Sequence, residues 1–185
     1  MPPSPIKINF VYAELDQDNR WQGDIYQLSS FRNFNRLPSV DYWMLANRTC
    51  QLYEKGNRKI KLNYLVYIAV YRLEQLLNYE KGHAKFKNQI KKLIKESEKH
   101  VYLPIFPERN IIKPLMANFN MIFTVPLENC PEAEQKILQL SSPFCEHVFQ
   151  KFARFYYTVG YDDEVFKTDD HFQELADQIE TNFKK

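Results

Sequence analysis

A long apolar stretch lies near the middle of the chain, over residues 63–79. Its apolar side chains occupy most of a helical wheel; they are Leu65, Val66, Ile68, Val70, Leu73, Leu76 and Leu77. A helix that is apolar on most of its sides is normally buried. The stretch therefore predicts a central buried helix that stops at Gly82.

Further helices are predicted from apolar spacing, capping residues and terminating glycines. They span residues 39–56, 84–100, 131–140, 142–160 and a last segment from Thr168 onward. Ser39 is the expected N-cap of the first, and Ser142 followed by Pro143 opens the fourth. Residues 5–12 alternate apolar and polar side chains, which predicts a strand, and residues 118–125 are a second short strand candidate.

Glycine content supports a helical reading of the whole chain. Only 4 of the 185 residues are Gly, which disfavours a β-sheet domain built on many tight turns. The expected fold is mainly α. It is a helical bundle, residues 37–185, on which an extended and partly strand-like N-terminal segment, residues 1–36, is packed.

Composition indicates a folded protein that does not cross a membrane. Hydrophobic residues make up 44% of the chain and aromatic residues 15%, which argues against disorder. No apolar run approaches the roughly 20 residues that span a bilayer, and the N-terminus has no secretory signal. Cys50, Cys130 and Cys145 are odd in number and widely spaced, which is typical of reduced thiols. We therefore expect a cytoplasmic protein.

Positive charge is concentrated in one part of the chain. Residues 54–99 contain twelve Lys or Arg and five Asp or Glu, whereas residues 128–185 contain six and twelve. Within the helix expected at 84–100, Lys85, Asn88, Lys92, Lys95 and Lys99 form a narrow stripe opposite an apolar face. The stripe is roughly 21 Å long at about 1.5 Å per residue. Cations repeated at helical spacing suit a nucleic-acid backbone, although a charge run is often only a solvated face.

Two other groups of side chains extend the candidate binding surface. Three cationic residues precede the apolar stretch and could add to the positive surface of the helix expected at 84–100; they are Arg58, Lys59 and Lys61. Tyr64, Tyr67 and Tyr71 recur at helical spacing beside Arg72, so they could stack on unpaired bases. The alternative for the tyrosines is ordinary packing at a helix boundary.

The sequence contains no catalytic or metal-binding signature. It lacks the glycine-rich phosphate loops, the zinc-protease motif and the nucleophile elbow. Cys145 and His147 lie two residues apart, which on a helix makes their side chains diverge. The acidic residues of 162–170 are expected to cap a helix rather than to bind a cation. We therefore expect no enzyme, no cofactor and no metal, although an active site assembled from scattered acids stays open.

Three segments carry a resemblance to a known family. They are Leu-Pro-Ser-Val-Asp-Tyr-Trp-Met-Leu-Ala (37–46), Tyr-Leu-Val-Tyr-Ile-Ala-Val-Tyr-Arg (64–72) and the basic helix after them. Together they resemble a small helical subunit of a type I CRISPR effector complex, equivalent to the carboxy-terminal helical part of the large subunit. The resemblance implies antiviral defence without an active site. It also implies phosphate contacts at Arg58, Lys59, Lys61, Lys85, Lys92, Lys95 and Lys99.

The expected function is a non-catalytic subunit of a larger ribonucleoprotein assembly. It would bind the backbone of a single strand or of an RNA–DNA duplex, and its acidic end would dock other subunits. One alternative is a protein-only adaptor or chaperone that binds a partner through aromatic surfaces. The other is an enzyme whose site no sequence motif reveals.

Overall fold

In the computed structural model, the described residues are 11–33, 40–54, 59–77, 83–104, 106, 111 and 113–159. The chain divides into two compact units, Met1–Phe152 and Ala153–Lys185. Only residues 153–159 of the second unit belong to the described part. The division expected at residue 36 stays a prediction.

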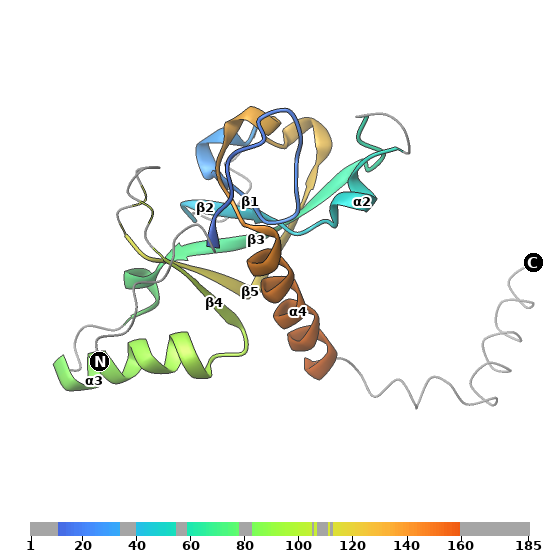
Figure 1. Cartoon of the computed structure of the whole chain (residues 1–185). Coiled ribbons are helices and arrows are strands. Elements are labelled where there is room, and N and C mark those ends of the chain that lie inside the picture. Colours follow the sequence, from blue (N-terminus) through green and yellow to red (C-terminus); the bar gives the residue numbers. More distant parts are fainter. Residues whose placement is uncertain are drawn as a thin grey trace, which may run out of the picture. The chain divides into compact units, whose positions relative to one another are not determined.

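The first unit is built on a curled six-stranded antiparallel sheet in the order β4-β5-β3-β2-β1-β6 (Figure 1). The strands are β1 (Asp24–Gln27), β2 (Tyr42–Leu45), β3 (Tyr64–Arg72), β4 (His100–Leu103), β5 (Leu115–Pro126) and β6 (Lys136–Gln139). The α-helices are α2 (Thr49–Leu52), α3 (His83–Lys91) and α4 (Ser142–Val159). The expectation of a mainly α helical bundle is therefore wrong.

The apolar stretch that was expected to be the central helix is instead the central strand β3. Its side chains alternate between the two faces of the sheet, and both faces are buried. Leu65, Tyr67 and Ala69 belong to one core cluster, while Ile68 and Val70 lie on the opposite face, and all five are fully buried. A strand that is packed on both faces has an uninterrupted apolar sequence. Periodicity alone does not distinguish such a sequence from that of a buried helix.

Two further helix predictions are also wrong. Residues 39–56 contain β2 and the single-turn helix α2, and residues 131–140 contain a short 3-10 helix, Ala133–Gln135, followed by β6. In β2, Trp43, Met44 and Leu45 are all fully buried although they point to alternate faces. Aromatic and long apolar side chains of this kind fit a pleated surface that is packed on both sides.

The shortage of glycine did not prevent a sheet because few strands are joined by tight turns. Short 3-10 helices follow three of the strands; they are Leu28–Ser30, Leu73–Leu76 and Leu127–Asn129. Such segments need no residue with positive φ. Among the described residues, Gly23 and Asn33 are the ones with positive φ.

Other sequence predictions are confirmed. The helix expected at 84–100 is present as α3 followed by a π-helical segment, Lys92–Glu96, and the helix expected at 142–160 is α4. The strand expected at 118–125 is the second half of the longer β5. Residues 5–10 and the helix expected from Thr168 lie outside the described residues.

Tyr12 connects the two ends of the curled sheet. It forms a bridge with Leu140, just after β6, and its hydroxyl donates a 2.8 Å hydrogen bond to the carbonyl oxygen of Pro104, just after β4. Its ring also stacks on Phe106 with a centroid distance of 5.1 Å. The two edge strands are therefore linked through one residue, by its backbone on one side and its side chain on the other.

Within the described part of the chain, no helix has the length and apolar character needed to cross a membrane.

Candidate nucleic-acid interface

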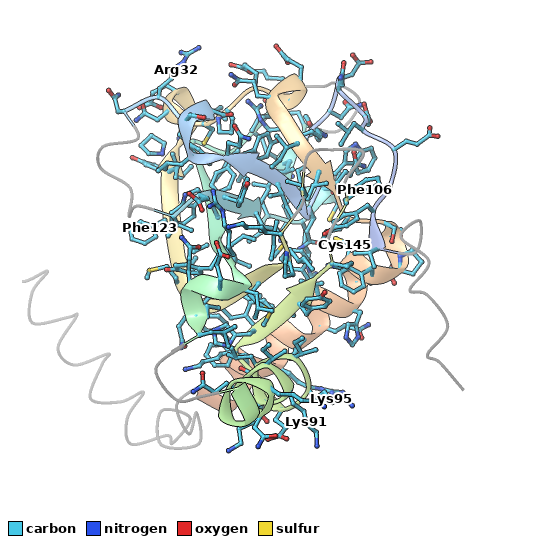
Figure 2. All side chains as sticks on the ribbon, turned by 90° about the vertical axis from the view of Figure 1, so that its left-hand side faces the viewer. Arg32, Lys91, Lys95, Phe106, Phe123 and Cys145 are labelled. Carbon is cyan, nitrogen blue, oxygen red and sulfur yellow. The ribbon has the colours of Figure 1, made fainter. Side chains whose placement is uncertain are left out.

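The segment from α3 to β4 presents a group of exposed ammonium groups. Among the side chains that the structure describes in this segment, five lysines are exposed, and we refer to them as the lysine surface: Lys87, Lys91, Lys92, Lys95 and Lys99. Figure 2 shows Lys91 and Lys95 pointing outward from the helix, away from the sheet. Each forms no ion pair with an acidic side chain of the described residues. The ammonium groups are therefore available to an external anion.

The opposite side of the same segment is partly buried. Ile90, Leu93 and Ile94 are half-buried, as the amphipathic pattern of the sequence predicts. The helix is therefore oriented with its apolar side inward and its lysines outward.

Lys151 of α4 fixes the point at which the lysine segment joins the sheet. Its ammonium group donates to the carbonyl oxygens of Ser97, at 2.6 Å, and His100, at 2.8 Å. Burial lowers the pKa of Lys151, and the nearby carboxylate of Glu98 opposes that shift. The Lys151 ammonium group is therefore bound within the protein, whereas the ammonium groups of the lysine surface are available to a ligand.

His100 adds no positive charge to this surface at neutral pH. Its side chain is buried at the start of β4, where Nδ1 lies 2.8 Å from the hydroxyl oxygen of Ser97. Burial, together with the nearby charges of Lys99 and Lys151, lowers the pKa of His100 to about 4. The His100 imidazole is therefore neutral at this pH.

Acidic side chains reduce the positive charge of the lysine surface only slightly. Glu96 and Glu98 are exposed on the same segment. Five lysines against two glutamates leave a clear excess of positive charge. The acidic residues of 162–180 lie outside the described residues.

The structure places the predicted phosphate contacts in two separate regions. Lys92, Lys95 and Lys99 belong to the lysine surface, while Lys59 and Lys61 lie just before the first residue of β3. The lysine segment leads into β4, whose first residue, His100, lies opposite Asn118 of β5, and Asn118 in turn pairs with Ala69 in the middle of β3. Ala69 lies five residues, or roughly 16 Å at about 3.3 Å per residue, along β3 from Tyr64. Arg58 and the side chain of Lys85 lie outside the described part.

Lys59 and Lys61 form a short hairpin with the end of α2. The amide of Glu54 donates to the carbonyl of Lys59, and the amide of Lys61 donates to the carbonyl of Leu52. The ammonium group of Lys61 also lies 3.5 Å from the carbonyl oxygen of Cys50. These two lysines are therefore not part of one continuous stripe with Lys92, Lys95 and Lys99.

The tyrosines proposed for base stacking do not share a surface. On a strand, Tyr64 points to the face opposite that of Tyr67 and Tyr71. Tyr64 is 58% exposed, whereas Tyr67 is fully buried and packs edge-to-face against Tyr26 and Phe31. The helical spacing that grouped these rings in the sequence does not exist in the structure.

Candidate catalytic and metal-binding groups are not assembled in the described residues. Cys145 is buried, and its thiol donates to the carbonyl oxygen of Gln22, while His147 is exposed on α4. Burial raises the pKa of Cys145 to about 12 and that of Cys130 to about 11, so both thiols are protonated at neutral pH. No group of three potential metal ligands is found within the described part. The acidic residues of 162–170 lie outside it.

A cavity that sequence reasoning missed lies where β1 and β3 end and β2 begins. Its volume is about 310 Å³. Its polar lining consists of Gln27, Ser29, Asp41 and Arg72, and its apolar lining consists of Leu28, Val40 and Tyr42. These residues come from three parts of the sequence that meet only through strand pairing, so no local motif could reveal them.

Sequence reasoning also missed Lys87 and Lys91. Both are exposed in α3. The signal was present in the sequence, because the lysine count of residues 84–100 includes them. The expected stripe assumed one ideal helical period over the whole segment, and neither lysine fell on it. In the structure the period changes, because a π-helical turn begins after Lys91.

Comparison with known proteins does not supply a family. No protein family matches the sequence, and no curated protein matches it.

Proposed function

We propose that this protein is a non-catalytic subunit that binds the sugar–phosphate backbone of nucleic acid through the lysine surface. The observation that carries the proposal is the row of exposed lysines that have no acidic partner among the described residues. Backbone binding requires repeated cations without a particular base-reading geometry. The lysine surface provides that pattern on a single segment.

The spacing of the lysines suits several phosphates of one strand. From Lys87 to Lys95 the chain advances eight residues, or roughly 12 Å at about 1.5 Å per residue. Lys91 lies between them one helical turn from each, so the three ammonium groups can contact successive phosphates. The half-buried residues on the other side of the segment keep this row turned outward.

In this proposal the protein acts in the cytoplasm as one part of a larger ribonucleoprotein assembly. The resemblance to a CRISPR effector subunit implied a helical bundle, so the proposal rests on the lysine surface and does not use that resemblance. Single strands and RNA–DNA duplexes offer the same phosphate chemistry, and both belong in the test.

The test is fluorescence anisotropy with a labelled single-stranded RNA and an RNA–DNA duplex, measured over a range of salt concentrations. The test variant is Lys91→Glu with Lys95→Glu. We expect its affinity to fall about tenfold or more and the slope of log affinity against log salt to decrease by about 1 to 2. Replacing Glu96 and Glu98 by Gln should strengthen binding, because it removes repulsion without adding a contact.

The matched control is Arg32→Glu with Arg48→Glu, which changes the net charge by the same amount at exposed positions away from the lysine surface. Figure 2 shows Arg32 at the end of the sheet opposite Lys91 and Lys95. Equal loss of affinity in the two double variants would mean that net charge rather than this surface governs binding. If the wild-type protein binds neither probe, the proposal is wrong and an adaptor that binds only protein becomes the better candidate.

A further inference from the structure

The cavity at the ends of β1, β2 and β3 is framed by backbone hydrogen bonds. Gln27 and Tyr42 are register partners on adjacent strands, and the amide of Leu28 donates a 2.9 Å hydrogen bond to the carbonyl oxygen of Asp41. On the other side of β2, Tyr42 pairs with Val70, two residues before Arg72. The side chains that line the cavity therefore project from a rigid part of the fold.

A charged pair forms one wall of the cavity. Arg72 Nε lies 3.0 Å from Asp41 Oδ2, and the two side chains are 38% and 37% exposed. Oδ2 itself is buried, and its contact with Nε is an ion pair that lacks the geometry of a hydrogen bond. Because the contact uses Nε and Oδ2, the other carboxylate oxygen of Asp41 and the outer nitrogens of Arg72 remain for a ligand. A hydrogen-bond acceptor and several donors are thus held side by side.

This pairing of charges selects a particular ligand chemistry. A free anion would be repelled by Asp41, and a cation would be repelled by Arg72. A neutral group that presents a donor next to an acceptor satisfies both, because it gives its N–H to the carboxylate and accepts from the guanidinium. The hydrogen-bonding edge of every nucleobase has adjacent donors and acceptors of this kind.

The other lining residues suit a flat ring. Tyr42 is half-buried, and Leu28 and Val40 add apolar surface. Aromatic side chains stack on bases without a strong preference for sequence. The volume of about 310 Å³ is sufficient for a single planar heterocycle.

We propose that this cavity binds one nucleobase, with Asp41 and Arg72 on its hydrogen-bonding edge and Tyr42 against its ring. The inference rests on the proposed function, since a bound strand would supply the base, but a free nucleotide carries the same chemistry. It does not require that one strand contact the cavity and the lysine surface at the same time.

Two probes that differ only in the presence of bases test the inference on a strand. They are a labelled single-stranded 10-mer and the same 10-mer in which every residue is abasic, both measured by anisotropy. We expect the base-containing strand to bind about tenfold more tightly to the wild-type protein. Equal affinity for the two strands would overturn the inference and leave backbone binding by the lysines intact.

The test variant is Arg72→Met with Asp41→Asn, which removes the guanidinium fork and the carboxylate and leaves the net charge of the protein unchanged. It should bring the affinity for the base-containing strand down to that for the abasic strand and leave the abasic affinity unchanged. The control is Lys113→Met with Glu74→Gln, which removes another surface ion pair, of 2.6 Å, outside the cavity. Lys91→Glu with Lys95→Glu should weaken binding of the abasic strand, which depends on the lysine surface alone.

A second measurement decides the inference even if no strand binds. Uridine, guanosine, adenosine and cytidine monophosphates are titrated at millimolar concentration and followed by two-dimensional NMR, with ribose 5-phosphate as the probe without a base. Saturable shifts of the Gln27, Asp41 and Arg72 signals with a nucleotide but not with ribose 5-phosphate support the cavity. If nucleotides bind and strands do not, the source of the base is a free nucleotide. Absence of shifts with every nucleotide overturns the inference.

Discussion

Lys136 and Asp24 form an ion pair that is completely removed from solvent. Lys136 Nζ lies 2.7 Å from Asp24 Oδ2, and both side chains have no exposed surface. The ammonium group also donates to the carbonyl oxygen of Asn19, and the backbone amide of Trp21 donates to the same carboxylate oxygen at 2.7 Å. The pair joins β6 to the start of β1, so it fixes the edge of the sheet to the loop before it.

Removing the lysine should destabilise the protein strongly. Lys136→Met leaves the Asp24 carboxylate buried without a counter-charge, which typically costs about 3–5 kcal/mol. Adding Asp24→Asn should recover part of that loss, because the uncompensated charge is then gone. Urea unfolding at pH 7 measures both effects. The comparison is Lys113→Met, which breaks an exposed ion pair and should change stability by less than about 1 kcal/mol. Similar losses in the two lysine variants would contradict this account.

Two buried groups should give opposite dependences of stability on pH. Burial raises the pKa of Asp24 to about 6, against the attraction of Lys136, so the folded state binds more protons than the unfolded state between pH 4 and 6. Stability from this group therefore falls as the pH rises through that range. The pKa of His100 is lowered to about 4, so the stability linked to it is present above about pH 6.5 and is lost as the pH falls toward 4.

The variant His100→Gln separates the two effects. It removes the contribution that rises with pH, so the stability advantage of the wild-type protein over the variant should grow between pH 4.5 and 6.5. Unfolding in urea at three pH values in this interval gives the difference directly. His147→Gln, at an exposed position of α4, is the control for replacing a histidine. An advantage that stays constant over the interval would show that His100 does not titrate differently in the folded state.

Local signals in the sequence identified the elements that are packed on one side only. The lysine helix and α4 each have an apolar side and a polar side, so their periodicity is visible in the sequence. The strand β3 has no polar side, because Tyr67 and Ile68 are both fully buried on opposite faces. Its enrichment in Val, Ile and Tyr favours a strand, and that signal was outweighed by the length of the apolar run.

The two candidate sites differ in the same respect, because one is local in the sequence and the other is assembled by strand pairing. The lysine surface is a property of one segment, so the helical stripe expected from the sequence contains three of its five members. The cavity depends on the pairing of β1 with β2 and of β2 with β3, which brings Gln27, Asp41 and Arg72 together. A single sequence carries no record of that pairing. The buried Asp24–Lys136 pair, whose partners are far apart in the chain, was missed for the same reason.

Gly23 should not tolerate a side chain. Its φ is +88°, and a Cβ atom there would lie 2.9 Å from Cys145 Sγ and 3.2 Å from Leu140 Cβ. Gly23→Ala therefore adds backbone strain to a steric clash, and we expect a loss of about 1–3 kcal/mol in urea unfolding. Combining it with Cys145→Ala should recover only the part due to the sulfur contact. Full recovery in the double variant would show that the backbone conformation itself carries no strain for alanine.

Lys151 controls how firmly the lysine surface is attached to the sheet. Within β4, the carbonyl of His100 points away from β5, because the hydrogen-bonded register places Lys99 opposite Phe119, whose amide donates to the Lys99 carbonyl. The Lys151 ammonium group occupies that outer position and also binds the carbonyl of Ser97. An edge strand whose outward carbonyl is bound in this way is less open to pairing with another chain.

Lys151→Met should therefore loosen this junction without unfolding the sheet. Hydrogen bonds to charged groups contribute about 1.5–3 kcal/mol each, so amide exchange in residues 97–103 should accelerate while β2 and β3 keep their protection. The pKa of His100 should also move upward, since one of the two nearby positive charges is removed. Lys92→Met, at an exposed position of the lysine surface, should leave exchange in residues 97–103 unchanged. Unaltered exchange in the Lys151 variant would mean that the packing of α4, rather than this ammonium group, holds the lysine segment in place.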